Sequence, residues 1–287
     1  MIATSSSVAL LHYTTRNLGD DIQTFAVRQF IDTHASVDRD RLHDDSVQRE
    51  LVLYGWLLHG RQWPPLASQH VHPLSIHVAP RSRPIVKRHI DWWRPLGIIP
   101  CRDSSTAAFF LSQSIPALFE GCVSLSLNRW VQRQPGCVVV VDVASNAGPQ
   151  IEFSEVLRRT HTLKQVEQAD QEYRQAAARA ALETYQRAEM VVTSRLHVML
   201  PCLAFGTPVL YVPSRKPPRA SDYTRMLDYL PYVETWDGQQ SYASGSRLPV
   251  NYRPTALIER VTARLGALAS DLKTYHSPLT ASHSSPQ

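Results

Sequence analysis

The sequence contains only four cysteines among its 287 residues, and none of them forms a Cys-x-x-Cys pair. Each lies in or beside a stretch that is predicted to be a buried strand or helix, so we expect reduced thiols in the core. They are Cys101, Cys122, Cys137 and Cys202. The twelve histidines are scattered, apart from one local group of His70, His72 and His77. Zinc sites need Cys and His clustered at ligand spacing, so the sequence argues against a structural metal.

Long apolar runs are also absent, since no stretch reaches about 18 consecutive apolar residues. The N-terminal residues lack the charged region and apolar segment of a signal peptide. We therefore expect a cytoplasmic protein, free in solution or at the inner face of the cell membrane.

The sequence lacks the usual nucleic-acid signatures: an RNA-binding aromatic motif, a helix-turn-helix with a basic face, or zinc-finger ligands. Its net charge is +5, spread along the chain, which suits nucleic acid, an anionic membrane face or a phosphorylated substrate. Without a motif, nucleic acid is the least supported of these partners, and we expect none to bind.

Apolar residues make up 43% of the chain, enough for packed cores, and strand patterns alternate with helix patterns. Strands are predicted at 8–13, 50–56, 74–78, 97–101, 137–143, 190–192 and 210–212. Helices are predicted at 20–33, 83–93, 104–112, 162–187, 196–205 and 255–273. This alternation predicts an α/β fold of two Rossmann-like units facing a cleft. The predicted units are residues 1–130 and 131–254, followed by a helix at 255–275 that packs across both and a flexible tail at 276–287.

The chain is organised around the stretch 188–212, where a short strand leads into an apolar helix. Ser194, Arg195, Leu196 and His197 occupy this turn, and free N–H groups at a helix start favour an anion there. An arginine and a histidine two residues apart form a candidate anion clamp with a proton donor beside it. The alternative is structural, with the arginine paired to a carboxylate and the histidine simply hydrogen-bonded.

Two other predicted strands end in similar polar turns. Asn17, Gly19 and Asp20 follow the first strand, where glycine permits a tight turn, although no complete G-x-G-x-x-G is present. Arg102 and Asp103 follow the strand at 97–101. Capping of the next helix is the competing explanation for both aspartates, and Asp21 could cap the first helix equally well.

Two loops are further candidates for substrate contact. One is irregular, at 59–65, and its neighbouring Trp56 and Trp63 suit either stacking on sugar rings or filling the core. The other is the basic segment 213–219, whose Arg215 can hold phosphate or lie on a solvated surface.

Several of these strings together resemble the polysaccharide pyruvyl transferase family. VTSRLHVMLPCLAFGTPVLYV at 192–212 resembles its S-R-L-H and A-f-G-t-P-v segment, and NLGDDIQT at 17–24 its N-x-G-D-x-x. CRDSST at 101–106 resembles its R-D-x-x-S/T, and GCVSLSL at 121–127 the G-C-L-T-L-T-L of a bacterial branch. The matches occur in the family's order and cover residues 8–215.

The resemblance implies transfer of pyruvate from phosphoenolpyruvate to two sugar hydroxyls, giving a cyclic ketal and phosphate. It also implies a compact glycosyltransferase-B-like architecture, with the acceptor on the N-terminal unit and phosphoenolpyruvate on the C-terminal unit. Arg195 matches the family's R-L-H arginine and Arg102 its R-D arginine, so both are expected to bind the donor anions. His197 is the expected general acid, and Asp20 or Asp103 would orient or deprotonate the acceptor. No cofactor or metal is expected.

Two other functions remain open from the sequence. A glycosyltransferase of the same architecture would use Arg195, His197 and the basic segment for a nucleotide sugar. A catalytically idle scaffold of polysaccharide assembly would need neither residue, so their presence argues against it. The expected acceptor is a sugar of a bacterial surface polysaccharide or its lipid-linked precursor, which would suit a basic surface at the membrane.

Overall fold

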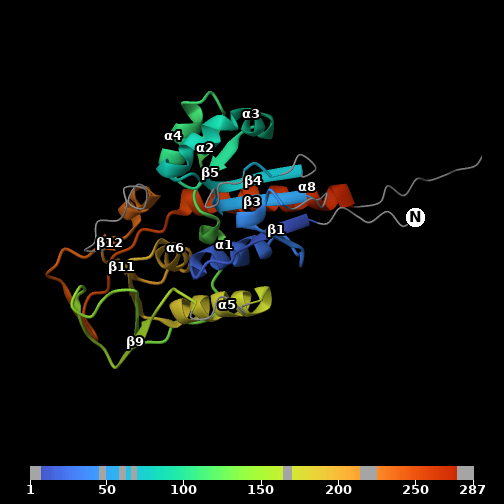
Figure 1. Cartoon of the computed structure of the whole chain (residues 1–287). Coiled ribbons are helices and arrows are strands. Elements are labelled where there is room, and N and C mark those ends of the chain that lie inside the picture. The colour runs from blue at the N-terminus through green and yellow to red at the C-terminus, as the bar shows by residue number, and fades with distance from the viewer. Residues whose placement is uncertain are drawn as a thin grey trace, which may run out of the picture.

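Two parallel β-sheets with helices packed between and around them make up the fold (Figure 1). The structure is a computed structural model that describes residues 8–44, 50–57, 63–65, 70–163, 170–213 and 225–276. The predicted α/β class is confirmed. None of the helices in these ranges is both long and apolar enough to cross a membrane.

The first sheet has the strand order β2-β1-β3-β4-β5-β6, and every pairing in it is parallel. Its strands are β1 (Val8–His12), β2 (Ser36–Asp38), β3 (Glu50–Trp56), β4 (His70–His77), β5 (Ile99–Cys101) and β6 (Ala117–Phe119). The order reverses direction between β1 and β3, which is the switch point of a doubly wound sheet.

The second sheet has the order β12-β11-β10-β7-β9, again entirely parallel. Its strands are β7 (Cys137–Val141), β9 (Glu155–Arg159), β10 (Met190–Thr193), β11 (Val209–Tyr211) and β12 (Glu234–Thr235). Strands β8 (Gln150–Glu152) and β13 (Ser241–Ala243) form a separate parallel pair. Strand β7 reads CVVVV and is buried throughout, as expected for a strand covered on both faces. The switch point here lies between β7 and β10.

The helices differ from the sequence prediction mainly at their ends. They are α1 (Leu18–Arg28), α2 (Arg83–Arg88), α3 (Ile90–Trp93), α4 (Ser104–Leu111), α5 (Gln171–Arg187), α6 (Leu196–Phe205) and α8 (Thr255–His276). Short 3₁₀ turns are η1 (Arg39–Arg41), η2 (Pro80–Ser82), η3 (Arg94–Leu96), η4 (Val123–Ser126) and η5 (Leu230–Tyr232).

Three of the helix predictions were wrong in extent. The helix predicted at 83–93 is divided at His89, whose φ of −118° and ψ of 34° are not helical. The helix predicted at 162–187 begins only at Gln171, after its Asp170 cap. Strands β8, at 150–152, and β9, at 155–159, were not predicted. The first helix begins at Leu18, with the Asn17 side chain accepting from Gly19 N at 3.2 Å, so neither Asp20 nor Asp21 is its cap.

The two sheets meet through helix α1, which contacts α5 and α6 (Figure 1). Arg174 of α5 binds Asp21 of α1 through Nε and Nη2, both at 2.8 Å, and the pair is buried. Burial raises the pKa of Asp21 to about 6 against the opposing effect of Arg174. Backbone hydrogen bonds join Leu18 N to His161 O and Leu163 N to Arg16 O. Because apolar residues of both sheets belong to one continuous core cluster, the two halves are packed together as one body.

Helix α8 packs on the segment that follows β6. Leu257 and Val261 lie against Gly121, and Arg264 binds the buried Glu120. The last long helix thereby covers the segment that leads from the first sheet to the second.

The His161→Gln variant should lose part of the pH dependence of stability. Burial, with a smaller effect of Arg195, lowers the pKa of His161 from 6.5 to about 4 in the folded protein. The unfolded chain therefore binds a proton between these pH values that the folded protein does not, and acidification from 6.5 toward 4 destabilises the wild type. Between about pH 7.5 and pH 5, denaturant titration should show the wild type losing about 2 kcal/mol relative to the variant.

The exposed His34 supplies the control. A His34→Gln variant should lose as much free energy of unfolding between the two pH values as the wild type does. Identical pH dependence of wild type and His161→Gln would contradict a neutral, buried His161.

Candidate functional site

A cavity of about 300 Å³ lies where the carboxyl ends of the two sheets face each other. Its lining residues come from both halves of the chain: Thr15, Asn17, Asp20 and Trp56 from the first, and His161, Arg195, Leu196, His197 and Arg225 from the second. The first group follows β1 or ends β3, and most of the second follows β9 or β10. Both switch points therefore open onto one cavity, which is where doubly wound sheets bind ligands.

Arg195 stands at the start of helix α6, between a buried strand and an apolar helix. Thr193 Oγ1, at the end of β10, accepts from Arg195 N at 3.0 Å and shapes this turn. Arg195 Nε donates to Asp142 Oδ2 at 2.7 Å, just beyond β7. The predicted carboxylate pairing is therefore present, but it uses one nitrogen only. The side chain is about half exposed, and its two terminal nitrogens have no hydrogen-bond partner among the described residues.

His197 is the second residue of helix α6, and its side chain is almost fully buried. Burial lowers its pKa well below 6.5, and the charges of Arg102 and Arg225 lower the pKa further. Arg102 Nη1 lies 3.5 Å from His197 Nε2, and a guanidinium can only donate. Because burial and the two arginine charges all oppose its protonation, His197 is neutral in the free protein.

Gly19 is required by the position of His197. A Cβ on Gly19 would lie 2.4 Å from His197 Nδ1 and 2.8 Å from its Cβ, far closer than non-bonded atoms approach. The predicted substrate-binding glycine thus has a steric role, because it allows the turn after β1 to rest on the imidazole.

Arg102 and Asp103 do not line the cavity, in contrast to their predicted contact with substrate. Arg102 is fully buried behind His197, with Nη1 3.4 Å from Gln23 Oε1, and its Nε and Nη2 have no partner among the described residues. Asp103 is buried too, accepting from Thr106 N at 2.9 Å as the cap of α4. Its other oxygen lies 2.6 Å from His77 Nδ1. The capping alternative was therefore correct for Asp103.

In the pair of His77 and Asp103, the imidazole is neutral. Burial, with a contribution from Arg102, lowers the pKa of His77 to about 4. Burial alone would raise the pKa of Asp103, but the hydrogen bond with His77 and the charge of Arg102 lower it. The pair is a structural element beneath the site.

Asp20 and Asn17 do reach the cavity, although each also has a structural partner. Asp20 Oδ2 accepts from Arg39 Nη1 at 3.2 Å and from Thr15 Oγ1 at 3.1 Å. Asn17 caps α1. Ser194 donates to Asp142 O at 3.1 Å and supports Arg195 indirectly.

Of the two candidate loops, little lies within the described ranges. Arg215 lies in 214–224, outside the described ranges, as do residues 59–62 of the irregular loop. Trp56 lines the cavity, whereas Trp63 is buried against Trp92 and Trp93, with ring centroids 5.0 and 5.3 Å away. The first tryptophan is a site residue and the second fills the core.

Sequence reasoning missed three residues of the cavity, Thr15, His161 and Arg225, and also missed Asp142, the carboxylate that binds Arg195. Asp142 follows the clearest strand of the chain, so its place at a strand end was a usable signal. His161 and Arg225 follow segments without clear periodicity and carry no comparable local signal.

Comparison with known proteins gives one family match and one structural neighbour of note. The model of the family described as "Polysaccharide pyruvyl transferase" matches residues 138–215, which contain Asp142, Arg195 and His197. None of the curated proteins matches the chain significantly.

A crystal structure of a functionally uncharacterized protein from Klebsiella pneumoniae subsp. pneumoniae is similar over 79% of this chain and 89% of that chain. The sequence identity is 13% and the TM-score is 0.49. The family model confirms the resemblance to the polysaccharide pyruvyl transferase family, and the part of the chain that it matches, residues 138–215, runs from β7 through the Arg195 and His197 turn.

Proposed function

We propose that this protein transfers pyruvate from phosphoenolpyruvate to two hydroxyls of a saccharide, forming a cyclic ketal and releasing phosphate. The observation that carries the proposal is the joint position of Arg195, Arg225 and His197 in one cavity between the two sheets. The family match covers two of these three residues and independently favours a pyruvyl transferase.

The cationic lining suits the donor. Phosphoenolpyruvate carries a carboxylate and a phosphate, and guanidinium groups bind both in a bidentate manner. Arg195 offers its two terminal nitrogens beside the N-terminus of α6, where helix N–H groups add favourable charge. Arg225 supplies a second cation to the cavity. A cavity of about 300 Å³ is at the small end for ligand sites, which fits this donor and one sugar ring better than a nucleotide sugar.

His197 is positioned to move the proton that the reaction needs. The donor methylene carbon must gain a proton while a sugar oxygen bonds to the adjacent carbon. A second sugar oxygen then bonds to the same carbon while the bond between this carbon and the phosphate oxygen breaks. The neutral imidazole of the free protein gains basicity when a phosphate enters beside it, so the bound donor itself prepares His197 as the acid.

In this proposal the acceptor binds on the side of the first sheet. Asp20 lines the cavity there and can accept the proton of an attacking hydroxyl, while the ring of Trp56 offers a surface on which a sugar can pack. Arg102 lies on the core side of His197, with Nη1 3.5 Å from Nε2, and it positions the imidazole rather than contacting phosphoenolpyruvate.

Arg195→Ala should weaken phosphoenolpyruvate binding by at least about tenfold, because each charge-assisted hydrogen bond lost costs about 1.5–3 kcal/mol. Thermal-shift titration with phosphoenolpyruvate, phosphate and a panel of nucleotide sugars measures this, since a ligand of the folded state raises Tm. Arg260→Ala removes an exposed arginine of α8 and should bind like the wild type. A Tm response to nucleotide sugars alone would instead indicate glycosyl transfer.

His197→Ala should bind phosphoenolpyruvate normally but lose turnover by about 10²–10⁴-fold, the usual contribution of a general acid. Phosphate release in the presence of saccharide acceptor measures the turnover, and calorimetry measures the binding. Normal turnover in His197→Ala would show that another group supplies the proton.

Gly19→Ala should reduce turnover by about 10²-fold, because the added Cβ displaces the imidazole from its productive position. Gly266→Ala, in α8 with no atom within 4 Å of the new Cβ, is the matched control and should retain activity. If Gly19→Ala turned over as fast as Gly266→Ala, the contact with His197 would not matter for catalysis.

A further inference from the structure

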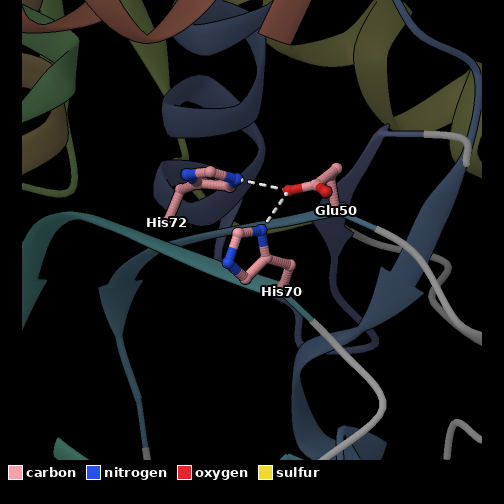
Figure 2. Close-up of side chains that lie close together, drawn as sticks. All are labelled: Glu50, His70 and His72. Carbon is pink, nitrogen blue, oxygen red and sulfur yellow. Dashed lines mark hydrogen bonds and ion pairs between the residues drawn. The ribbon is translucent and has the colours of Figure 1, made fainter. Parts of the chain in front are cut away.

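Three potential metal ligands gather at the amino ends of two neighbouring strands in the first sheet (Figure 2). Glu50 is the first residue of β3 and His70 the first of β4, and the two are direct partners in the parallel register. His72, two residues along β4, points to the same face because side chains of a strand alternate. We propose that Glu50, His70 and His72 form a binding site for a divalent transition-metal ion, with zinc as the best-suited ion.

The distances between the three ligand atoms favour this assignment. Glu50 Oε2 lies 2.6 Å from His72 Nε2 and 3.1 Å from His70 Nδ1. All three atoms fall within 4.8 Å of one another. Zinc binds nitrogen and oxygen at about 2.0–2.2 Å, so tetrahedral ligands lie about 3.3 Å apart. Side-chain movements of less than about 1–2 Å would place an ion among these three atoms.

The burial of the three side chains also suits a metal site. Glu50 is 13% exposed and His72 is 21% exposed, so their orientation is held by the surrounding sheet. His70 is 70% exposed, can turn toward an ion, and leaves solvent access for a water as the fourth ligand. Two imidazoles and one carboxylate with an open position are a set that zinc accepts, and calcium or magnesium would prefer oxygen ligands.

The site is separate from the cavity between the sheets. In β3 the cluster begins at Glu50 and the cavity at Trp56, so opposite ends of one strand carry the two sites, about 20 Å apart at 3.3 Å per residue. An ion there would tie the starts of β3 and β4 together without touching the donor. The proposal therefore stands or falls independently of pyruvyl transfer.

The sequence pointed away from this site because it grouped the wrong residues. It placed His77 with His70 and His72, whereas His77 lies at the far end of β4 and binds Asp103. Glu50 is distant in sequence and joins the histidines only through strand pairing.

Competition of the full-length, metal-free protein with a chromophoric chelator for Zn²⁺ tests the proposal. We expect one tight site in the wild type, weakened at least about tenfold in Glu50→Gln, His70→Gln and His72→Gln, since even losing a residue that only supports a ligand costs 10–100-fold. His34→Gln, an exposed histidine outside the cluster, should bind as the wild type does. The four cysteines are buried and do not compete in the folded protein.

Thermal unfolding provides a second readout. Zn²⁺ should raise the Tm of the wild type and of His34→Gln, but not of His70→Gln, whose exposed side chain can be replaced with little risk to folding. Equal Zn²⁺ affinity in the wild type and in folded His70→Gln and Glu50→Gln, or no saturable binding to the wild type, would overturn the proposal.

Discussion

The close contact between helix α1 of the first half and the start of helix α6 in the second determines the shape of the site. Gly19 lies so near His197 that no side chain fits between them. The buried pair of Asp21 and Arg174 holds α1 against α5 of the second half, and removing one partner of such a pair generally costs about 3–5 kcal/mol. The backbone pairing of Leu18 with His161 runs beside it. The cavity therefore depends on the two halves being held together, rather than on either half alone.

Burial and arginine charge together set the protonation of the site. His77, His161 and His197 all have lowered pKa values, in each case chiefly through desolvation. Of these three imidazoles, His161 and His197 line the cavity beside Arg195, whose charge is only partly neutralised through its single hydrogen bond to Asp142. Such a lining favours an anion, and the anion in turn raises the basicity of the imidazole beside it.

Much of the fold could be predicted from local patterns. Strands β1, β3, β5, β7, β10 and β11, the second half of β4, and helices α4, α6 and α8 were predicted because apolar periodicity and end signals coincide there. The predicted start of α5 was wrong because the segment before the helix has a similarly polar composition, so composition does not mark where the helix begins. Strands β8 and β9 were missed because their side chains are largely exposed and their sequence is mostly polar.

The candidate site was predictable only where a strand end marked it. Arg195 and His197 were found from their turn, and Asn17 and Asp20 from theirs. Arg102 and Asp103 occupy the same kind of turn, yet they point into the core, which no local pattern distinguishes. The partnership of Arg195 with Asp142 and the grouping of Glu50 with two histidines arise from pairing between distant strands.

The most direct test of the account is a crystal structure of the protein soaked with phosphoenolpyruvate. The account predicts the ligand in the cavity between the sheets, with its carboxylate or phosphate on the terminal nitrogens of Arg195 and its methylene carbon within reach of the His197 imidazole. Phosphoenolpyruvate bound elsewhere, or a cavity that stays empty at saturating ligand, would contradict it.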